Sequence, residues 1–139
     1  MTVQTKLVEL STAGNADVVD ITSAVVNAVK ESAVLNGIVS IFSPSATSAL
    51  TTIEYESGCI DDLQRLFNEI ADPGRHYAHN ARWGDGNGHS HVRAALLGPS
   101  LTVPFVAGVL TLGTWQQIIF VDFDNRSRRR RLVAQIIGE

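Results

Sequence analysis

The second half of the chain constrains the fold most, because it is a series of short strand-type segments with turns between them. After His91, apolar runs rich in β-branched residues alternate with turn-forming pairs such as Gly98-Pro99 and Ala107-Gly108. The strands that this pattern predicts cover residues 92–97, 102–106, 110–113, 117–123 and 131–137. Short strands joined by tight turns favour a mostly antiparallel sheet.

The first half adds two amphipathic helices to this sheet. Apolar residues at helical spacing predict helices over residues 22–34 and 59–71, and Pro73-Gly74 ends the second one. Further strands are expected over residues 2–10, 17–21, 38–43 and 49–56. The chain has 139 residues, which is enough for one core. We therefore expect a single α+β domain over residues 1–139, with a mostly antiparallel or mixed sheet and two main helices.

Composition and charge exclude several classes of protein. Hydrophobic residues make up 45% and charged residues 18%, which excludes a disordered chain. The formal net charge of −3 makes nucleic-acid binding unlikely. No apolar run is long enough to cross a membrane, and no secretory signal is visible. The single cysteine, Cys59, cannot form an internal disulfide, so we expect a soluble cytoplasmic protein.

All four histidines lie between residues 76 and 91, at the end of a glycine-rich segment (72–90). If His89 and His91 begin a strand, their side chains point to the same face, with Cβ atoms roughly 7 Å apart. Two imidazoles at that separation can bind one metal ion, and His79 can join them from the loop. Two interpretations of these histidines are equally good. They form a site for a divalent metal or an anion, or they are solvated surface groups.

Neighbouring residues favour a site over solvated histidines. Asp85 and Asn87 can hydrogen-bond to imidazole N–H groups and so orient metal-bound histidines. The glycines at 84, 86 and 88 allow backbone amides to approach an anionic ligand closely. Arg93 follows His91 by two residues, so on a strand it would share the face of His91 and could contact phosphate.

Two other polar groups have a structural interpretation that we prefer. The residues from Ser45 to Glu56 include several hydroxyl side chains and Glu54, and they fit a threonine-rich strand with a solvent face better than a pocket with Glu54 as base. The arginine run 126–131 fits a solvated hairpin turn better than an RNA or phosphate patch, because no aromatic residues lie between the arginines. Trp115 is expected in the core.

Three stretches together resemble the YjbQ family, also called the secondary thiamine-phosphate synthase enzyme family. They are ATSALTTIEYE (46–56), YAHNARWGDGNGHSHVRAALLGPSLTVP (77–104) and LGTWQQIIFVDFD (112–124), and the terminal QIIGE also fits. The resemblance implies a compact α+β domain that assembles as a homotrimer. It also implies a pocket lined by histidines and a weak thiamine-phosphate synthase activity.

The resemblance also assigns individual residues of the site, because they match positions in the family's motifs. His79 matches the histidine of Y-x-H, and Asn87 and His91 match N-x-x-x-H. Glu54 closes the TTIE segment, and Gln116 is the glutamine of GTWQ. We therefore expect catalytic roles for His79, His91 and Glu54, and ligand contacts from Ser45, Thr47, Asn87, Arg93 and Gln116.

One position departs from the family pattern. Many members carry a histidine where this chain has Ser45, within a pattern like H-T-T-A. A hydroxyl is a poorer ligand than imidazole for zinc-like ions, so we expect His89 to take over part of that role. The expected metal ligands are then His79, His89 and His91, holding zinc or magnesium.

The expected function is an enzyme-like one. A pyrimidine diphosphate would be coupled to a thiazole phosphate with loss of pyrophosphate, in a pocket that holds a small phosphorylated molecule and a divalent metal. The alternative is a non-catalytic trimeric module that binds a small anionic ligand or a partner protein.

Overall fold

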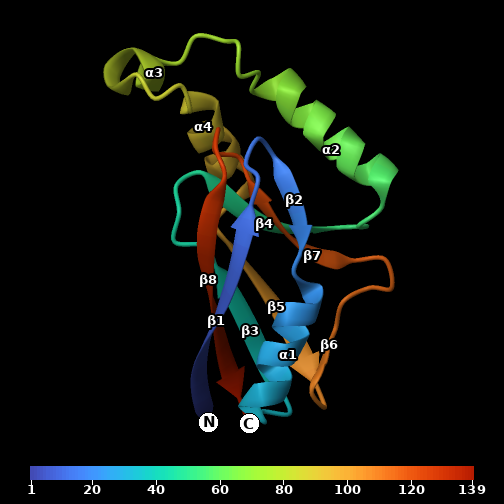
Figure 1. Cartoon of the computed structure of the whole chain (residues 1–139). Helices are drawn as coiled ribbons and strands as arrows, with labels where there is room; N and C mark the ends of the chain where they lie inside the picture. Colours follow the sequence, from blue (N-terminus) through green and yellow to red (C-terminus); the bar gives the residue numbers. More distant parts are fainter.

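The chain folds into two antiparallel sheets and four helices (Figure 1), in a computed structural model that describes residues 1–139. The strands are β1 (Thr2–Thr12), β2 (Asp17–Asp20), β3 (Gly37–Phe42), β4 (Ser48–Ile53), β5 (Ser100–Val106), β6 (Val109–Leu110), β7 (Gln117–Asp122) and β8 (Arg128–Gly138). The helices are α1 (Thr22–Ser32), α2 (Ser57–Ile70), α3 (Ala78–Trp83) and α4 (Gly88–Leu97). None of the helices is long and apolar enough to cross a membrane.

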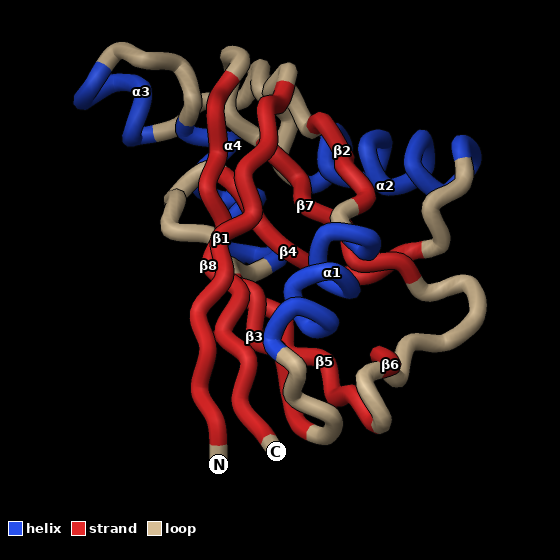
Figure 2. The backbone as a smooth tube through the Cα atoms, turned by 60° about the horizontal axis from the view of Figure 1, so that its bottom comes forward, coloured by secondary structure: helices blue, strands red, loops and turns tan.

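The strands divide into a large and a small sheet (Figure 2). The large sheet has the order β1-β8-β3-β5-β6, and the small sheet has the order β2-β7-β4. Every neighbouring pair runs antiparallel. The single-domain α+β architecture with an antiparallel sheet is therefore confirmed.

The small sheet is buried on both faces. Successive side chains of a strand point to opposite sides, so β7 contributes to two cores. Ile118 and Phe120 pack with α1 and the inner face of the large sheet. Ile119 and Val121 pack with α2 and α4. All four side chains are fully buried, which explains why residues 118–121 form an uninterrupted apolar run.

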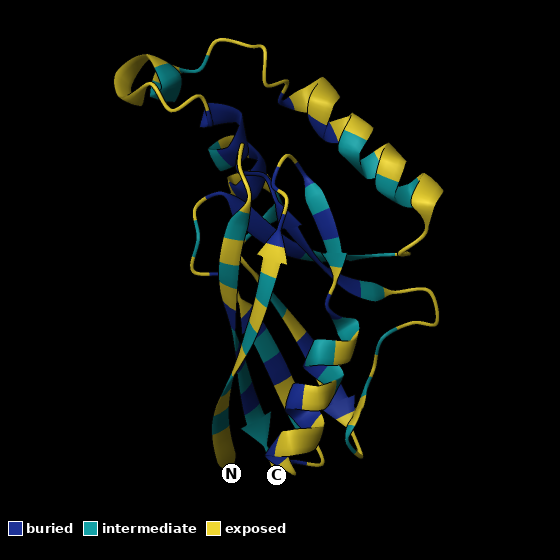
Figure 3. Ribbon diagram, viewed as in Figure 1, coloured by how far each residue is buried: buried dark blue, intermediate teal, exposed yellow.

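The outer helix α2 packs on the second core through Phe67, with Ile60 and Leu63 partly buried beside it. Of its 14 residues only Phe67 is buried, and Figure 3 shows the rest of its outer side as exposed. Phe67 meets Phe123 edge to face, with ring centroids 4.7 Å apart. The Arg93 guanidinium of α4 lies 5.9 and 6.0 Å from these two rings and donates to the carbonyl oxygen of Ala71. One buried arginine thus joins α2 to α4.

The strand predicted over residues 92–97 is wrong, because this segment belongs to α4. Buried residues recur there at helical spacing, as Ser90, Arg93 and Ala94 do, and the alanine and leucine residues that follow favour a helix. The segment 72–90 is also less irregular than expected, since it contains α3. The helices predicted over 22–34 and 59–71 are confirmed, with ends shifted by a few residues.

The outer face of the large sheet carries no helix and has two apolar rows, with a polar row of Thr5, Gln135 and Ser40 between them. In the β-sheet register Leu7 and Phe42 both flank Val133, and Val3 and Ile38 both flank Ile137. These pairings form two apolar rows across β1, β8 and β3. Val3, Leu7, Ile38 and Phe42 are each 40% exposed or more. An exposed apolar sheet face of this kind is a feature of interaction surfaces.

Candidate functional site

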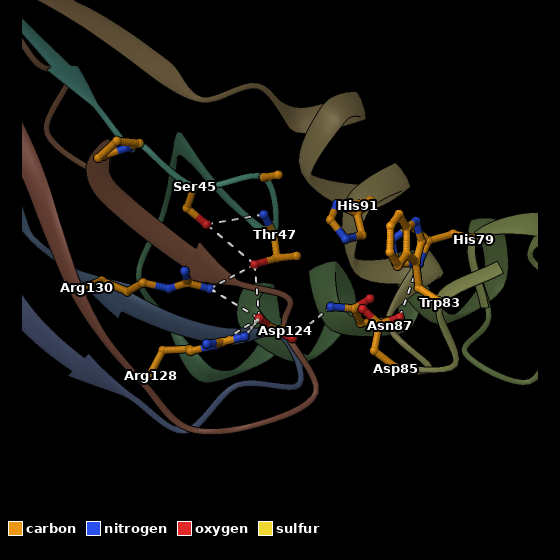
Figure 4. Close-up of a pocket in the computed structure, with 12 residues that line it drawn as sticks. Ser45, Thr47, His79, Trp83, Asp85, Asn87, His91, Asp124, Arg128 and Arg130 are labelled. Carbon is orange, nitrogen blue, oxygen red and sulfur yellow. Dashed lines mark hydrogen bonds and ion pairs between the residues drawn. The ribbon is translucent and has the colours of Figure 1, made fainter.

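A polar cavity of about 510 Å³ opens at one end of the small sheet (Figure 4). Four segments meet there: the loop before β4, α3 with the turn after it, the start of α4, and the β7–β8 connection with the start of β8. The lining residues are Pro44, Ser45, Ala46, Thr47, His79, Trp83, Asp85, Asn87, His91, Asp124, Arg128 and Arg130. Only two of these twelve residues are hydrophobic, so the cavity suits a polar or charged ligand.

Two short helices supply one wall of the cavity. His79 and Trp83 are four residues apart on α3, and Asn87 and His91 are four residues apart at the start of α4. That spacing places each pair on one face of its helix. The imidazole rings of His79 and His91 lie with centroids 4.5 Å apart and planes inclined by 42°.

The glycines between α3 and α4 serve the chain's own packing. Gly84 and Gly86 adopt positive φ angles of 72° and 70°, which side chains disfavour. A Cβ at Gly88 would lie 2.6 Å from Cβ of Tyr77, so only glycine fits. The amides of Gly84 and Gly88 donate to the backbone and side-chain oxygens of Asn80. These two amides are therefore already paired within the protein.

Two buried aspartates hold two arginines at the opposite wall. Asp122 accepts from Nε and Nη2 of Arg130 at 2.7 and 2.9 Å. Asp124 accepts from Nε of Arg128 at 2.9 Å and pairs with its Nη2 at 2.7 Å. Thr47 Oγ1 accepts from Arg130 and donates to Asp124. The Nη1 groups of both arginines have no hydrogen-bond partner in the protein.

The arginine run is divided between the two faces of β8. Arg128 and Arg130 face the cavity, whereas Arg129 and Arg131 pair with Glu9 of β1 on the other face, at 3.3 and 3.2 Å. The predicted solvated turn is wrong for Arg128 and Arg130, because alternation along a strand turns them toward buried carboxylates.

Asp124 stays ionised in spite of its burial. Desolvation raises the pKa of this carboxyl, but hydrogen bonds from the Asn125 N–H, Arg128 and Asn87, with the charge of Arg128, outweigh it and hold the pKa below its usual value. A charged Asp124 is what keeps Arg128 in place.

Asn87 lies between two carboxylates. One atom of its amide is 3.3 Å from Oδ1 of Asp124, and the other is 3.0 and 3.2 Å from the two carboxylate oxygens of Asp85. His79 approaches the same carboxylate, with Nδ1 3.3 Å from Oδ1 of Asp85. This Nδ1 atom is buried and makes no hydrogen bond.

The structure separates His89 from the other histidines. Residues 89 and 91 lie on a helix, so their side chains are about 200° apart around its axis. His89 is buried next to Tyr77, with ring centroids 6.2 Å apart, and does not line the cavity. The predicted ligand set His79, His89 and His91 is therefore not assembled, and no group of three His, Cys, Asp or Glu side chains is arranged to hold a metal.

Three more predicted site residues lie away from the cavity. Glu54 is exposed near the Cys59 thiol, and Gln116 donates to Thr52 Oγ1 at 3.1 Å. Arg93 is 2% exposed and is engaged under α2. Trp115, expected in the core, is 70% exposed. Of the predicted residues, Ser45, Thr47, His79, Asn87 and His91 do line one cavity.

Sequence reasoning missed one wall of the cavity. Asp124, Arg128 and Arg130 were not recognised as a group, although a D-x-D pattern ends a buried strand and an R-x-R pattern begins the next. Two acidic residues at a spacing of two before a short connection, and two basic residues at the same spacing after it, are a signal for ion pairs across that connection.

The fold and the cavity define an α+β domain with a polar pocket built from histidine, aspartate and arginine. The family model described as "UPF0047 protein YjbQ-like" matches residues 6–139. The chain belongs to this YjbQ/UPF0047 family.

Relatives and solved structures agree with this assignment. A UPF0047 protein of Methanothermobacter thermautotrophicus is 38% identical over 139 residues, which are 100% of this chain and 95% of that protein. A YbjQ-like protein of unknown function from Sulfolobus solfataricus has a solved structure with a TM-score of 0.94 and 35% identity, covering 99% of each chain. A hypothetical protein from Aeropyrum pernix gives a TM-score of 0.91 and 31% identity, covering 98% of this chain and 99% of that one.

The burial of His89 predicts a pH-dependent stability. Desolvation and the nearby charge of Arg93 lower the pKa of His89 in the folded state. Below pH of about 6.5 the unfolded chain takes up a proton that the folded chain resists, so the free energy of unfolding falls as the pH falls. We expect the melting temperature of His89→Gln to depend less on pH than that of the wild type, between about pH 7 and about pH 5.

The exposed His76 provides the matched control, since His76→Gln should melt with the wild-type pH dependence. Equal pH dependence in the wild type and His89→Gln would contradict the prediction. Differential scanning fluorimetry at several pH values measures all three proteins.

Proposed function

We propose that the cavity binds a small phosphorylated molecule. The observation that carries the proposal is the pair of guanidinium groups, Arg128 and Arg130, fixed at the cavity wall with their Nη1 groups unpaired. Guanidinium donors suit phosphate oxygens, and holding them in advance lowers the entropy cost of binding. The hydroxyl of Ser45 lies at the same wall and offers a further hydrogen bond.

The family resemblance suggests which reaction such a pocket performs. In a thiamine-phosphate synthase reaction a bond forms between a thiazole and a pyrimidine. The C–O bond to the diphosphate breaks, and its electron pair leaves with pyrophosphate. Arg128 and Arg130 would stabilise the charge of the leaving group, and His91 would donate a proton to it. His79, whose ring packs at an angle beside that of His91, would keep it in place.

Binding is tested with inorganic pyrophosphate by isothermal titration calorimetry, in the presence of a chelator. Arg128→Gln removes one guanidinium and should weaken pyrophosphate binding by about 10-fold or more. Arg129→Gln is the matched control, because Arg129 is the next residue and faces the other side of β8. Its affinity should equal that of the wild type, and equal weakening in both variants would contradict the proposal.

Turnover is tested by complementation of a thiamine-requiring strain. We expect growth with the wild type, and loss of growth with His91→Asn although this variant still binds pyrophosphate. His76→Asn, at an exposed position outside the cavity, should support growth. Binding without growth in a well-expressed wild type would favour the alternative, a non-catalytic module that binds a small anionic ligand.

We also propose that three copies of the chain assemble through the two apolar rows on the outer face of the large sheet. The two apolar rows around Val133 and Ile137 span three strands, and nothing in the chain covers them. A second copy is the occupant that the family resemblance suggests, and closed rings of identical chains bury such faces. A cytoplasmic location remains a prediction from the sequence.

Phe42→Ser should shift the protein from trimer to monomer, because it removes the aromatic side chain from one of these rows. Light scattering should give about 45 kDa for the wild type, three chains of 15.0 kDa, and about 15 kDa for the variant. Leu66→Ser is the control, since Leu66 is 47% exposed on α2, on the far side of the small sheet. A wild type that elutes as a monomer would overturn the proposal.

A further inference from the structure

We propose that α3 is a lid, which closes over a bound phosphorylated molecule and brings Arg82 and Trp83 into contact with it. The inference rests on the proposed binding of such a molecule in the cavity. It adds two ligand-binding residues, neither of which was expected from the sequence, and it makes the cavity a site that changes shape when a ligand binds.

Helix α3 stands apart from the body of the protein. Figure 1 shows it at the end of the long connection from α2, beyond the start of α4. None of its six residues is buried, and the residues on either side of it, 72–76 and 84–86, are exposed. A segment with so few buried apolar contacts moves at small energetic cost.

The turn between α3 and α4 can serve as the hinge. Gly84 and Gly86 have positive φ angles there, and a Cβ at Gly84 would meet no atom within 4 Å. A Cβ at Gly86 would meet only the Asn125 side chain, at 3.7 Å. The turn is therefore surrounded by open space and can bend without a clash. A few such loop residues are enough to absorb a hinge motion.

One hydrogen bond keeps α3 attached to α4 beyond this hinge. The amide oxygen of Asn80, in the middle of α3, accepts from the N–H of Gly88 at 2.8 Å. This contact lies close to the hinge, so it can persist while α3 rotates about it. The motion that we infer is thus a rotation of a short rigid helix and not its unfolding.

Trp83 is the residue that gains most from closure. It borders the cavity, yet it is 70% exposed. Figure 4 shows it beside His79, on the wall opposite the arginines. Rotation of α3 toward that opposite wall would bury the indole against the ligand, and burial of a large aromatic side chain is favourable. It would also exclude water from the phosphate contacts.

The charges make closure depend on the ligand. Helix α3 carries Arg82 and no acidic residue. Before a ligand binds, the charges of Arg128 and Arg130 are balanced by the two aspartates that hold them, so the arginine wall attracts Arg82 little. A phosphorylated ligand adds negative charge at this wall, and that charge attracts Arg82.

Closure also needs contacts that differ between the open and the closed state, because a ligand shifts such an equilibrium only through them. Arg82 does not line the cavity in the open state, and most of Trp83 faces water there. Both residues would reach the ligand only when α3 closes. They therefore provide the difference in binding that favours the closed state.

The test is acrylamide quenching of tryptophan fluorescence with pyrophosphate as the ligand, since the chain has two tryptophans, Trp83 and Trp115. Both are 70% exposed, and Trp115 lies outside the cavity. Trp115→Phe leaves Trp83 as the reporter, and saturating pyrophosphate should lower its quenching constant by about 2-fold or more. Trp83→Phe leaves Trp115 as the matched control, whose quenching constant should not change.

A second measurement separates closure from a contact that Trp83 makes without moving. Arg82→Gln should weaken pyrophosphate binding by about 3-fold or more in calorimetry with a chelator, although Arg82 does not line the open cavity. Arg75→Gln removes the same charge from an exposed residue that donates to carbonyl oxygens at the end of α2. Its affinity should equal that of the wild type.

Unchanged quenching of Trp83, at a pyrophosphate concentration that saturates the protein in calorimetry, would overturn the lid. Equal affinities in Arg82→Gln and Arg75→Gln would overturn it as well. A wild type that binds no pyrophosphate would overturn both this inference and the proposed function. Calorimetry of the wild type therefore distinguishes failure of the lid from failure of the binding site.

Discussion

The cavity depends on the ion pairs that two buried aspartates make with two arginines. Asp122 ends the most deeply buried strand, β7, and Asp124 follows it, and both are almost fully excluded from water. Loss of one member of a buried pair costs about 3–5 kcal/mol, because the remaining charge has no partner. The same contacts connect the end of β7, the start of β8 and Thr47 before β4. They therefore stabilise the junction of three segments and position the arginines that face the cavity.

Much of the architecture could be predicted from local patterns. Buried and more exposed residues alternate along β1 and β8, and apolar residues recur at helical spacing along α1 and α2. Each of these patterns is long enough to identify the type of element. The segment 88–97 was harder, because a short apolar run fits either a strand or a helix. Its helical period depends on Ser90 and Arg93, polar residues whose burial the sequence does not reveal.

The same mistake explains why the site was only partly predicted. A strand would place His89 beside His91, whereas the helix pairs His91 with Asn87, as the N-x-x-x-H spacing itself suggests. His79, Asn87, Ser45 and Thr47 were found through the family resemblance, and all of them border the cavity. Arg128 and Arg130 were missed because their role depends on which face of β8 meets Asp122 and Asp124, and tertiary packing decides this.

The pairing of β1 with β8 has a consequence for how the protein forms on the ribosome. β1 is an edge strand, and β8, made of residues 128–138, is its only partner in the sheet. Contacts between residues so far apart in the sequence form late. They raise the contact order, which slows folding. β1 leaves the ribosome long before β8 does and must wait for it. Until then the unpaired backbone hydrogen-bonding groups of β1 can pair with other chains. Aggregation during synthesis is therefore expected to begin at this strand.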